Sequence, residues 1–374
     1  MQTKNVVPML SAEGYRRRQR AFDEQPAKPT TYYGRPMLKK PTWKWFIPLY
    51  LFLGGVAGGV ALLGALAELL GGPRHRATVR HARYLSLLLS ILCPIFLILD
   101  LGRPARFHHM LRVFKVSSPL SVGTWILSAF GLCSGALAVR QAAEDDVIIR
   151  RRSRLGRMLR AVPTAPLAAL HGLLGICLGG YTGTLLAATA VPLWQAGGVL
   201  LGPLFLSDAV TSGAAMLSLV GAATGEDSLR AREDIENVDS LGTVAQLGLV
   251  VARAALMPPR VRRPLRRGFW GGVWRFGAIG AGMIAPLSLR LALRLGRWKP
   301  GRALSIIISA LSLLGALAER FALTEAGKIS AEDPLAYQDM TRGLPGEARP
   351  TPLQQVVGAP AMPARKPQVA AMDT

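Results

Sequence analysis

Eight runs of roughly 20 mostly apolar residues are the feature of this sequence that most restricts its fold. A helix needs about 20 residues to cross the hydrocarbon core of a bilayer, which is roughly 30 Å thick. Half of the residues are hydrophobic and 18% are charged, which is typical of membrane proteins. The runs cover residues 45–70, 83–101, 120–139, 165–189, 197–222, 240–257, 270–291 and 303–323. We therefore predict an all-α integral membrane protein, a bundle of about eight transmembrane helices.

The two ends of the chain differ from this central part. They are rich in Pro, Ala and charged residues and show no periodic apolar positions. We predict an extramembrane tail over residues 1–42, the bundle over 43–325 and a disordered tail over 326–374. The first 30 residues contain no apolar segment typical of a signal peptide, so the first span is expected to act as its own insertion signal.

A formal net charge of +23 raises the question of nucleic-acid binding. The Lys and Arg residues lie in short loops between apolar runs, where anionic headgroups and membrane topology explain them. The odd-numbered loops hold 18 basic residues and the even-numbered loops hold nine. The positive-inside rule then places both termini outside the cytoplasm, although the ten basic residues of the N-terminal part up to Lys44 favour the opposite orientation.

Metal ligands are scattered along the sequence. Cys93, Cys133 and Cys177 each lie alone in a separate apolar run, and His171 is the one histidine of five within a run. Iron–sulfur clusters, zinc sites and c-type haems require grouped Cys or His residues, and a b-type haem requires two suitably placed His ligands. We predict no metal site, haem or iron–sulfur cluster held by this chain.

The first run contains paired glycines at helical spacing, namely Gly54, Gly55, Gly58 and Gly59. Small residues at this spacing let a neighbouring helix approach closely within lipid. A phosphate-binding loop would also require Lys and Ser or Thr, which are absent here. The first span is therefore predicted to be central in the bundle.

Polar residues converge on one membrane face, where spans one and three begin and spans two and four end. The face receives Trp43, Lys44, Asp100, Arg103 and Tyr181. Asp100 precedes a Gly-Arg-Pro break, where it can meet water, Arg103 and a ligand, or simply pair with Arg103 at the interface. Tyr181 lies about ten residues, or roughly 15 Å, before the end of its span, and either a site or a core role suits that depth. Lys44 either reaches the headgroups or contacts a ligand.

Other ionisable residues lie within or beside the spans, where an unpaired charge costs several kcal/mol. Glu68, His171 and Asp208 form a candidate proton path from the opposite face toward this polar face. Alternatively, Asp208 pairs with Arg253 or Arg275, and His171 is a packing residue.

Five sequence blocks follow one another in order. They are TYYGRPMLKKPTWKWFIPLYLFLGGVAGG, DLGRPARFHHMLRVFKVSSPLSVGTW, GYTGTLLAATAVPLWQ, LFLSDAVTSGAAM and RFALTEAGKISAEDP. This order resembles the NrfD/PsrC family, the polysulfide reductase-type membrane subunits, over residues 31–345.

The resemblance implies an eight-helix subunit without haem in the bacterial inner membrane, not catalytic by itself. It implies that menaquinone or ubiquinone binds and that electrons pass to or from a ferredoxin-like iron–sulfur subunit. A molybdopterin oxidoreductase or a multihaem cytochrome c subunit would complete the complex. Whether electron transfer is coupled to proton movement stays open.

The resemblance also assigns residues. Asp100 matches the acidic end of the second span, Tyr181 matches the YTG tyrosine, and Lys44 beside Trp43 stands where some members have His or Asn. Tyr181 is then the donor to a quinone oxygen, Asp100 the proton acceptor and Arg103 its electrostatic partner. Two rival hypotheses are a secondary transporter that uses Asp208 and a structural membrane anchor without quinone activity.

Overall fold

The computed structural model describes residues 36–147, 153–226, 228–298 and 301–342. Within these ranges, eight helical segments are long and apolar enough to cross a membrane. They are Phe46–Leu70, Gly72–Asp100, Pro119–Glu144, Thr164–Ala187, Gly198–Thr224, Leu229–Leu256, Gly268–Leu295 and Arg302–Glu332. The predicted all-α membrane bundle is confirmed. Most of the predicted N-terminal tail, and residues 343–374 of the C-terminal one, lie outside the described residues.

Most spans are single α-helices, and the others join consecutive helices. The single helices are α2 (Phe46–Leu70), α4 (Pro119–Glu144), α6 (Thr164–Ala187), α9 (Leu229–Leu256) and α12 (Arg302–Glu332). The composite spans are η2 (Gly72–His75) with α3 (Arg76–Asp100), η4 (Gly198–Leu200) with α8 (Leu201–Thr224), and α10 (Gly268–Gly272) with the π-helix η6 (Val273–Ile284) and α11 (Ala285–Leu295). Shorter helices in the described chain are η3 (Pro104–Leu111), α5 (Arg154–Ala161), α7 (Pro192–Gln195), η5 (Arg263–Leu265) and α13 (Pro334–Arg342).

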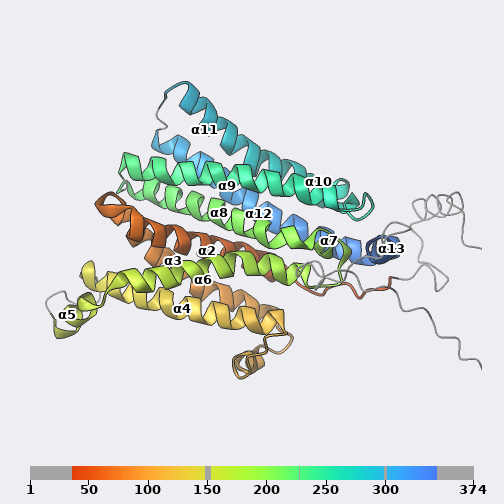
Figure 1. The fold of residues 1–374 in the computed structure, drawn as a ribbon, viewed down its shortest axis with the longest axis horizontal. Coiled ribbons are helices and arrows are strands. Elements are labelled where there is room, and N and C mark those ends of the chain that lie inside the picture. Colours follow the sequence, from red (N-terminus) through yellow and green to blue (C-terminus); the bar gives the residue numbers. More distant parts are fainter. Residues whose placement is uncertain (1–35, 148–152, 227, 299–300, 343–374) are drawn as a thin grey trace, which may run out of the picture.

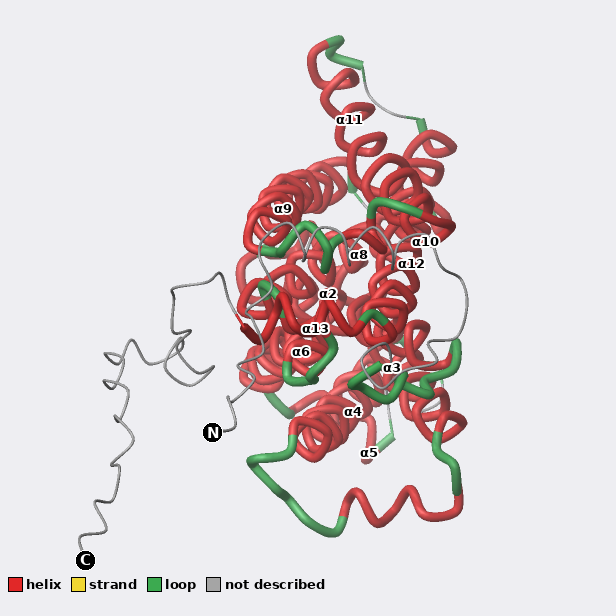
Figure 2. The backbone as a smooth tube through the Cα atoms, turned by 90° about the vertical axis from the view of Figure 1, so that its right-hand side faces the viewer, coloured by secondary structure: helices red, strands yellow, loops and turns green. Residues whose placement is uncertain are grey.

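The spans form two groups that meet at α2 and α8. One group contains α2 with α3, α4 and α6, and the other contains α8 with α9, η6 and α12 (Figures 1 and 2). The end of the bundle that carries α7, α10 and α13 is called the α7 end, and the end that carries α5 is called the α5 end (Figure 1). Helices α2 and α4 begin at the α7 end, and α3 and α6 finish there, as the alternation of spans requires.

Several spans are longer than the apolar runs indicate. The second begins at Gly72 rather than 83, the sixth at Leu229 rather than 240, and the eighth ends at Glu332 rather than 323. These extensions carry charged side chains that are paired inside the protein, such as Asp239, which lies 2.5 Å from Arg290. Pairing offsets the cost of burying a charge, so the helix continues past its apolar part. The helices α12 and α13 therefore continue through residues 326–342, part of the segment assigned to the C-terminal tail.

Backbone contact through glycine places α2 at the centre of the bundle. A Cβ atom on Gly58 would lie 3.0 Å from the backbone nitrogen of Gly179 in α6. A Cβ atom on Gly59 would lie 2.6 Å from the carbonyl carbon of Ala209 and 3.1 Å from Cα of Gly213, both in α8. The two glycines thus let α6 and α8 approach α2 from two sides, which confirms the predicted central position of this span.

Replacing Gly59 with alanine tests this contact. The added methyl group would overlap the backbone of α8, and we expect a loss of about 1–3 kcal/mol in the free energy of unfolding. Gly135→Ala in α4 is the matched control, because no atom lies within 4 Å of its Cβ position. There we expect no loss and a gain of up to about 1 kcal/mol. Equal thermal unfolding midpoints for the two variants in detergent would contradict the proposed role of Gly59.

Candidate functional site

Two hydrogen bonds join four chain segments at the α7 end. The backbone N–H of Lys44, just before α2, donates to Oδ1 of Asp100 at the end of α3 over 3.0 Å. The hydroxyl of Tyr181 in α6 donates to the carbonyl oxygen of Pro119, the first residue of α4, over 2.5 Å. The structure therefore brings a carboxylate and a phenol to the same end of the first four spans, without a direct bond between them in the described chain.

Tyr181 is held from several sides. Its ring lies against Gly123 in α4, where any Cβ atom would overlap the phenol. Tyr50 in α2 is buried, 3% exposed. Tyr181 is six residues before Ala187, where α6 ends. The phenol is therefore nearer the end of its helix than the sequence suggests, because α6 ends before the Val-Pro-Leu-Trp segment.

Asp100 and Arg103 are separated at the turn between α3 and η3. Asp100 is partly exposed, whereas Arg103 is exposed, and the structure shows no ion pair between these two described residues. The carboxylate instead accepts the N–H of Lys44, while the chain turns at Gly102 and enters η3 at Pro104. In this conformation the Asp100 carboxylate is therefore bound by the backbone of Lys44 and not by Arg103.

Trp43 and Lys44 contact the rest of the protein in ways that their sequence positions do not reveal. The ring of Trp43 stacks on that of Trp194 in α7, with centroids 5.2 Å apart and an interplanar angle of 14°. Its carbonyl oxygen accepts a hydrogen bond of 2.6 Å from Nζ of Lys328 in α12. Trp194 in turn donates through Nε1 to the carbonyl oxygen of Leu323 over 2.8 Å. Lys44 itself is exposed, and it binds Asp100 through its backbone N–H rather than through its ammonium group.

Glu68 and His171 lie close together toward the α5 end. Both line a narrow cavity of about 10 Å³, together with Arg83. Arg83 donates to Glu68 over 2.8 Å and to Oε1 of Gln141 over 2.8 Å. Nε2 of His171 is 2.8 Å from Oγ of Ser134. Glu68 and Arg83 also line a cavity of about 740 Å³ at the α5 end.

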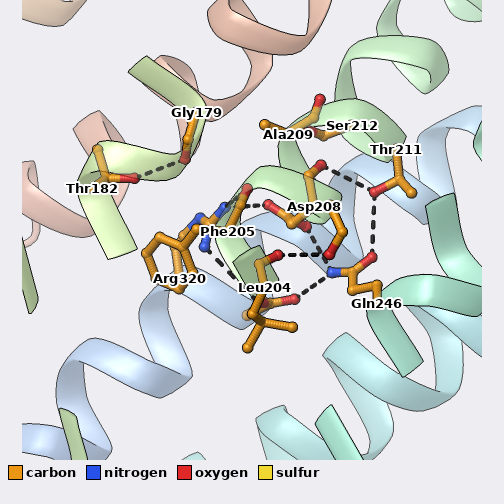
Figure 3. A network of polar contacts seen from close by, with 12 residues as sticks. Gly179, Thr182, Leu204, Phe205, Asp208, Ala209, Thr211, Ser212, Gln246 and Arg320 are labelled. Carbon is orange, nitrogen blue, oxygen red and sulfur yellow. Dashed lines mark hydrogen bonds and ion pairs between the residues drawn. The ribbon is translucent and has the colours of Figure 1, made fainter. Parts of the chain in front are cut away.

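Asp208 belongs to a separate buried network among α8, α9 and α12 (Figure 3). Its Oδ2 is 2.5 Å from Nη2 of Arg320, and its Oδ1 accepts a hydrogen bond of 3.1 Å from Gln246. The same amide nitrogen donates to Glu319 over 2.7 Å. Arg320 also lies over the ring of Phe205, with Cζ 3.5 Å from the centroid. Asp208, Glu319 and Arg320 are at most 2% exposed, so their charges interact with one another away from bulk water. Oε1 of Glu319 and the Nε and Nη1 atoms of Arg320 have no hydrogen-bond partner among the described residues.

The cation of this network differs from both candidates named from the sequence. Asp208 pairs with Arg320, not with Arg253 or Arg275. Arg320 escaped notice because it lies near the end of the eighth apolar run, where an arginine normally reaches the headgroups. The helix continues to Glu332, which places Arg320 inside the bundle instead.

A second buried ion pair was also missed. Asp239 in α9 and Arg290 in α11 lie 2.5 Å apart and are 0% and 4% exposed. Each stands at the edge of an apolar run, so sequence alone assigns it to a loop. The sequence did contain an indication of this pair, because Asp239 and Arg290 lie on the same membrane side of adjacent predicted spans.

The fold and the polar groups define a multi-pass integral membrane protein with several paired charged residues buried inside an eight-span bundle. Residues 36–331 match the family model described as Polysulphide reductase, NrfD, and the chain therefore belongs to the NrfD family. Proteins of this family are generally membrane anchors of oxidoreductase complexes and work with other redox subunits.

Two curated relatives span the same region. The chain is 24% identical over 308 residues to Protein NrfD homolog of Haemophilus influenzae, covering 77% of this chain and 95% of the relative. It is 25% identical over 314 residues to Protein NrfD of Escherichia coli, again covering 77% of this chain and 95% of the relative. The matching part thus includes nearly the whole of each relative.

Substitution of Arg320 tests the buried network. We expect Arg320→Gln to lower the free energy of unfolding by about 3–5 kcal/mol, because it leaves the Asp208 carboxylate without its cation. Adding Asp208→Asn should restore part of this loss, since the uncompensated charge is then removed. Arg157→Gln, at an exposed position in α5, should change stability by less than about 0.5 kcal/mol. Unfolding in detergent measures all variants, and strictly additive effects at Arg320 and Asp208 would contradict the pair.

Proposed function

We propose that this protein is the quinone-reactive membrane subunit of an oxidoreductase complex. The observation that carries the proposal is the placement of Asp100 and Tyr181 at one end of the first four spans, each tied to a neighbouring helix by a hydrogen bond. A quinone head group needs hydrogen bonds to its two oxygens and an acceptor for protons at a lipid-accessible boundary. Membership of the NrfD family supports the same role.

The proposed chemistry assigns one task to each residue. Tyr181 donates to one quinone oxygen in place of the Pro119 carbonyl that it contacts here. Oxidation of a quinol releases two electrons and two protons, and Asp100 accepts protons as the electrons leave. Arg103 lies at the exposed rim, where movement of its turn would bring it to the carboxylate. Trp43 and Lys44 complete the proposed quinone contacts.

The electrons pass to or from a partner docked at the α7 end. We propose a ferredoxin-like iron–sulfur subunit there, linked to a molybdopterin oxidoreductase or a multihaem cytochrome c subunit. Menaquinone or ubiquinone is the substrate in the membrane. The basic loops at the α5 end support placing that end in the cytoplasm of a bacterium, with the protein in the inner membrane and both termini in the periplasm.

Proton movement is a further part of the proposal. Glu68 and His171 line one narrow cavity beside a larger one at the α5 end, which suits proton entry from that side. Asp208 and Glu319 share the amide of Gln246 farther along the bundle. In the direction of quinone reduction, which consumes two protons with two electrons, we propose that protons pass from the first group toward the second, and then toward the quinone.

The secondary-transporter hypothesis draws on the charged network within the bundle. Asp208 is engaged by Arg320 and Gln246, so its carboxylate is already satisfied without a solute. This observation favours the redox proposal over solute transport. The structural-anchor hypothesis makes a different prediction, since it requires no chemistry from Asp100 or Tyr181.

Quinol-dependent turnover of the whole complex tests the proposal. We expect Asp100→Asn to lower it by about 100-fold, because the amide keeps the acceptor for Lys44 but takes up no proton. Tyr181→Phe should lower it at least roughly tenfold by removing one donor to the transition state. Tyr84→Phe is the matched control. The Tyr84 hydroxyl donates to Asp145 over 2.8 Å, so this variant also loses a tyrosine hydrogen bond, but it does so at the α5 end.

Unchanged turnover in both site variants would overturn the redox assignment and support a structural anchor. Saturable solute uptake by the protein in vesicles, lost in Asp208→Asn, would support the transporter instead. Photoaffinity labelling with a quinone analogue should mark the segment around Tyr181.

A further inference from the structure

A cavity at the α7 end lies far along the sequence from the proposed quinone site. It measures about 420 Å³ and is bordered by α8, α9, the loop around η5, and η6. Apolar side chains form much of its wall, namely Leu204, Val250, Met257, Trp274 and Ile279. The π-helical winding of η6 forms one side, and such windings are frequent at functional sites.

Four arginines line the same cavity, and no Asp or Glu does so within the described chain. They are Arg253, Arg262, Arg266 and Arg275. Arg266 and Arg275 are exposed, whereas Arg253 is only 2% exposed. An apolar wall with an arginine rim matches a ligand that has an anionic head and an apolar body.

The buried arginine retains donor capacity. Nη2 of Arg253 donates to the carbonyl oxygen of Leu193 over 2.5 Å, but its buried Nε has no hydrogen-bond partner. Arg262 is similar, because Nη1 donates to the carbonyl oxygen of Ala254 over 2.9 Å while its buried Nε has none. Unsatisfied buried guanidinium nitrogens are costly, and an anion in the cavity would relieve that cost.

Carboxylates near the cavity are occupied elsewhere. Glu319 accepts a hydrogen bond from Gln246 and lies 3.9 Å from Arg320. Asp333 pairs with Arg260, which does not line the cavity, over 3.4 Å. The positive charge of the cavity is therefore not matched by the protein itself.

An exposed apolar strip continues from the cavity along α9. Val251 lines the cavity and is 69% exposed, and Val244 and Leu241 are 57% and 72% exposed. Their spacing of seven and three residues places them on one face of the helix. This face leads from the arginines toward the middle of the membrane, in the direction that an acyl chain would take.

We propose that this cavity binds an anionic phospholipid. The phosphate lies among Arg253, Arg262, Arg266 and Arg275, and an acyl chain follows the strip on α9. A quinone head is neutral and would leave the arginines unmatched. An acidic segment of a partner protein would not use an apolar wall that belongs to membrane spans.

Native mass spectrometry of the full-length protein in detergent tests the proposal. Phosphatidylglycerol should be retained as a single adduct, and phosphatidylcholine should not. Arg266→Gln combined with Arg275→Gln should weaken phosphatidylglycerol retention roughly tenfold or more. The control combines Arg112→Gln with Arg267→Gln, which removes two exposed arginines at the same end that do not line the cavity. It should retain the lipid within about twofold of the unmodified protein.

Other outcomes would overturn the lipid assignment. Equal retention of phosphatidylcholine would show that the charge of the lipid is not recognised. Displacement of phosphatidylglycerol by inorganic phosphate would identify a free-anion site. Its displacement by a quinone analogue would identify a quinone site. Arg266→Lys with Arg275→Lys keeps the charge and should keep binding. All variants should have equal melting temperatures in lipid-free detergent, which would show that a variant that retains less lipid has lost binding and not folding.

Discussion

Close backbone contact between α2 and its two neighbours is the constraint on which the rest of this structure depends. Gly58 admits α6 and Gly59 admits α8, so α2 packs against members of both groups of spans. Lipid supplies no hydrophobic force between helices, and close van der Waals contact between small residues replaces it. The positions of Tyr50 and Tyr181 follow from this contact, because both lie on helices that it fixes.

Buried charge is the second organising feature, and it is arranged in layers along the bundle. Arg83 with Glu68 lies toward the α5 end, and Arg320 with Asp208 lies deeper in the bundle. Each cation has a carboxylate partner from another helix, which reduces the cost of leaving water. Such ion pairs fix how neighbouring helices are shifted along one another, which apolar contact alone would not fix. The proposed proton path uses the same charged groups.

The α7 end combines two chemically different sites in our proposals. The first four spans present Asp100 and Tyr181, which suit proton and electron exchange with a quinone. The last four spans present an arginine-lined cavity, which suits an anionic lipid. The tryptophan stack of Trp43 on Trp194 lies between the two groups and connects the start of α2 to α7. A lipid bound at the second site would stabilise the surface on which we propose that a redox partner docks.

The sequence determined the number of spans, the central position of the first span and the family, because apolar length, glycine spacing and ordered motifs are local properties of the chain. It also placed Asp100 and Tyr181 at one membrane end, since alternating spans fix which ends coincide. Only the tertiary structure decided that Asp208 pairs with Arg320, that Arg103 is apart from Asp100 and that helices extend past their apolar runs. The reason is physical. A buried charged side chain pairs with the opposite charge that lies nearest on a neighbouring helix. That distance depends on how each helix is rotated about its axis and shifted along its neighbour, which hydropathy does not encode.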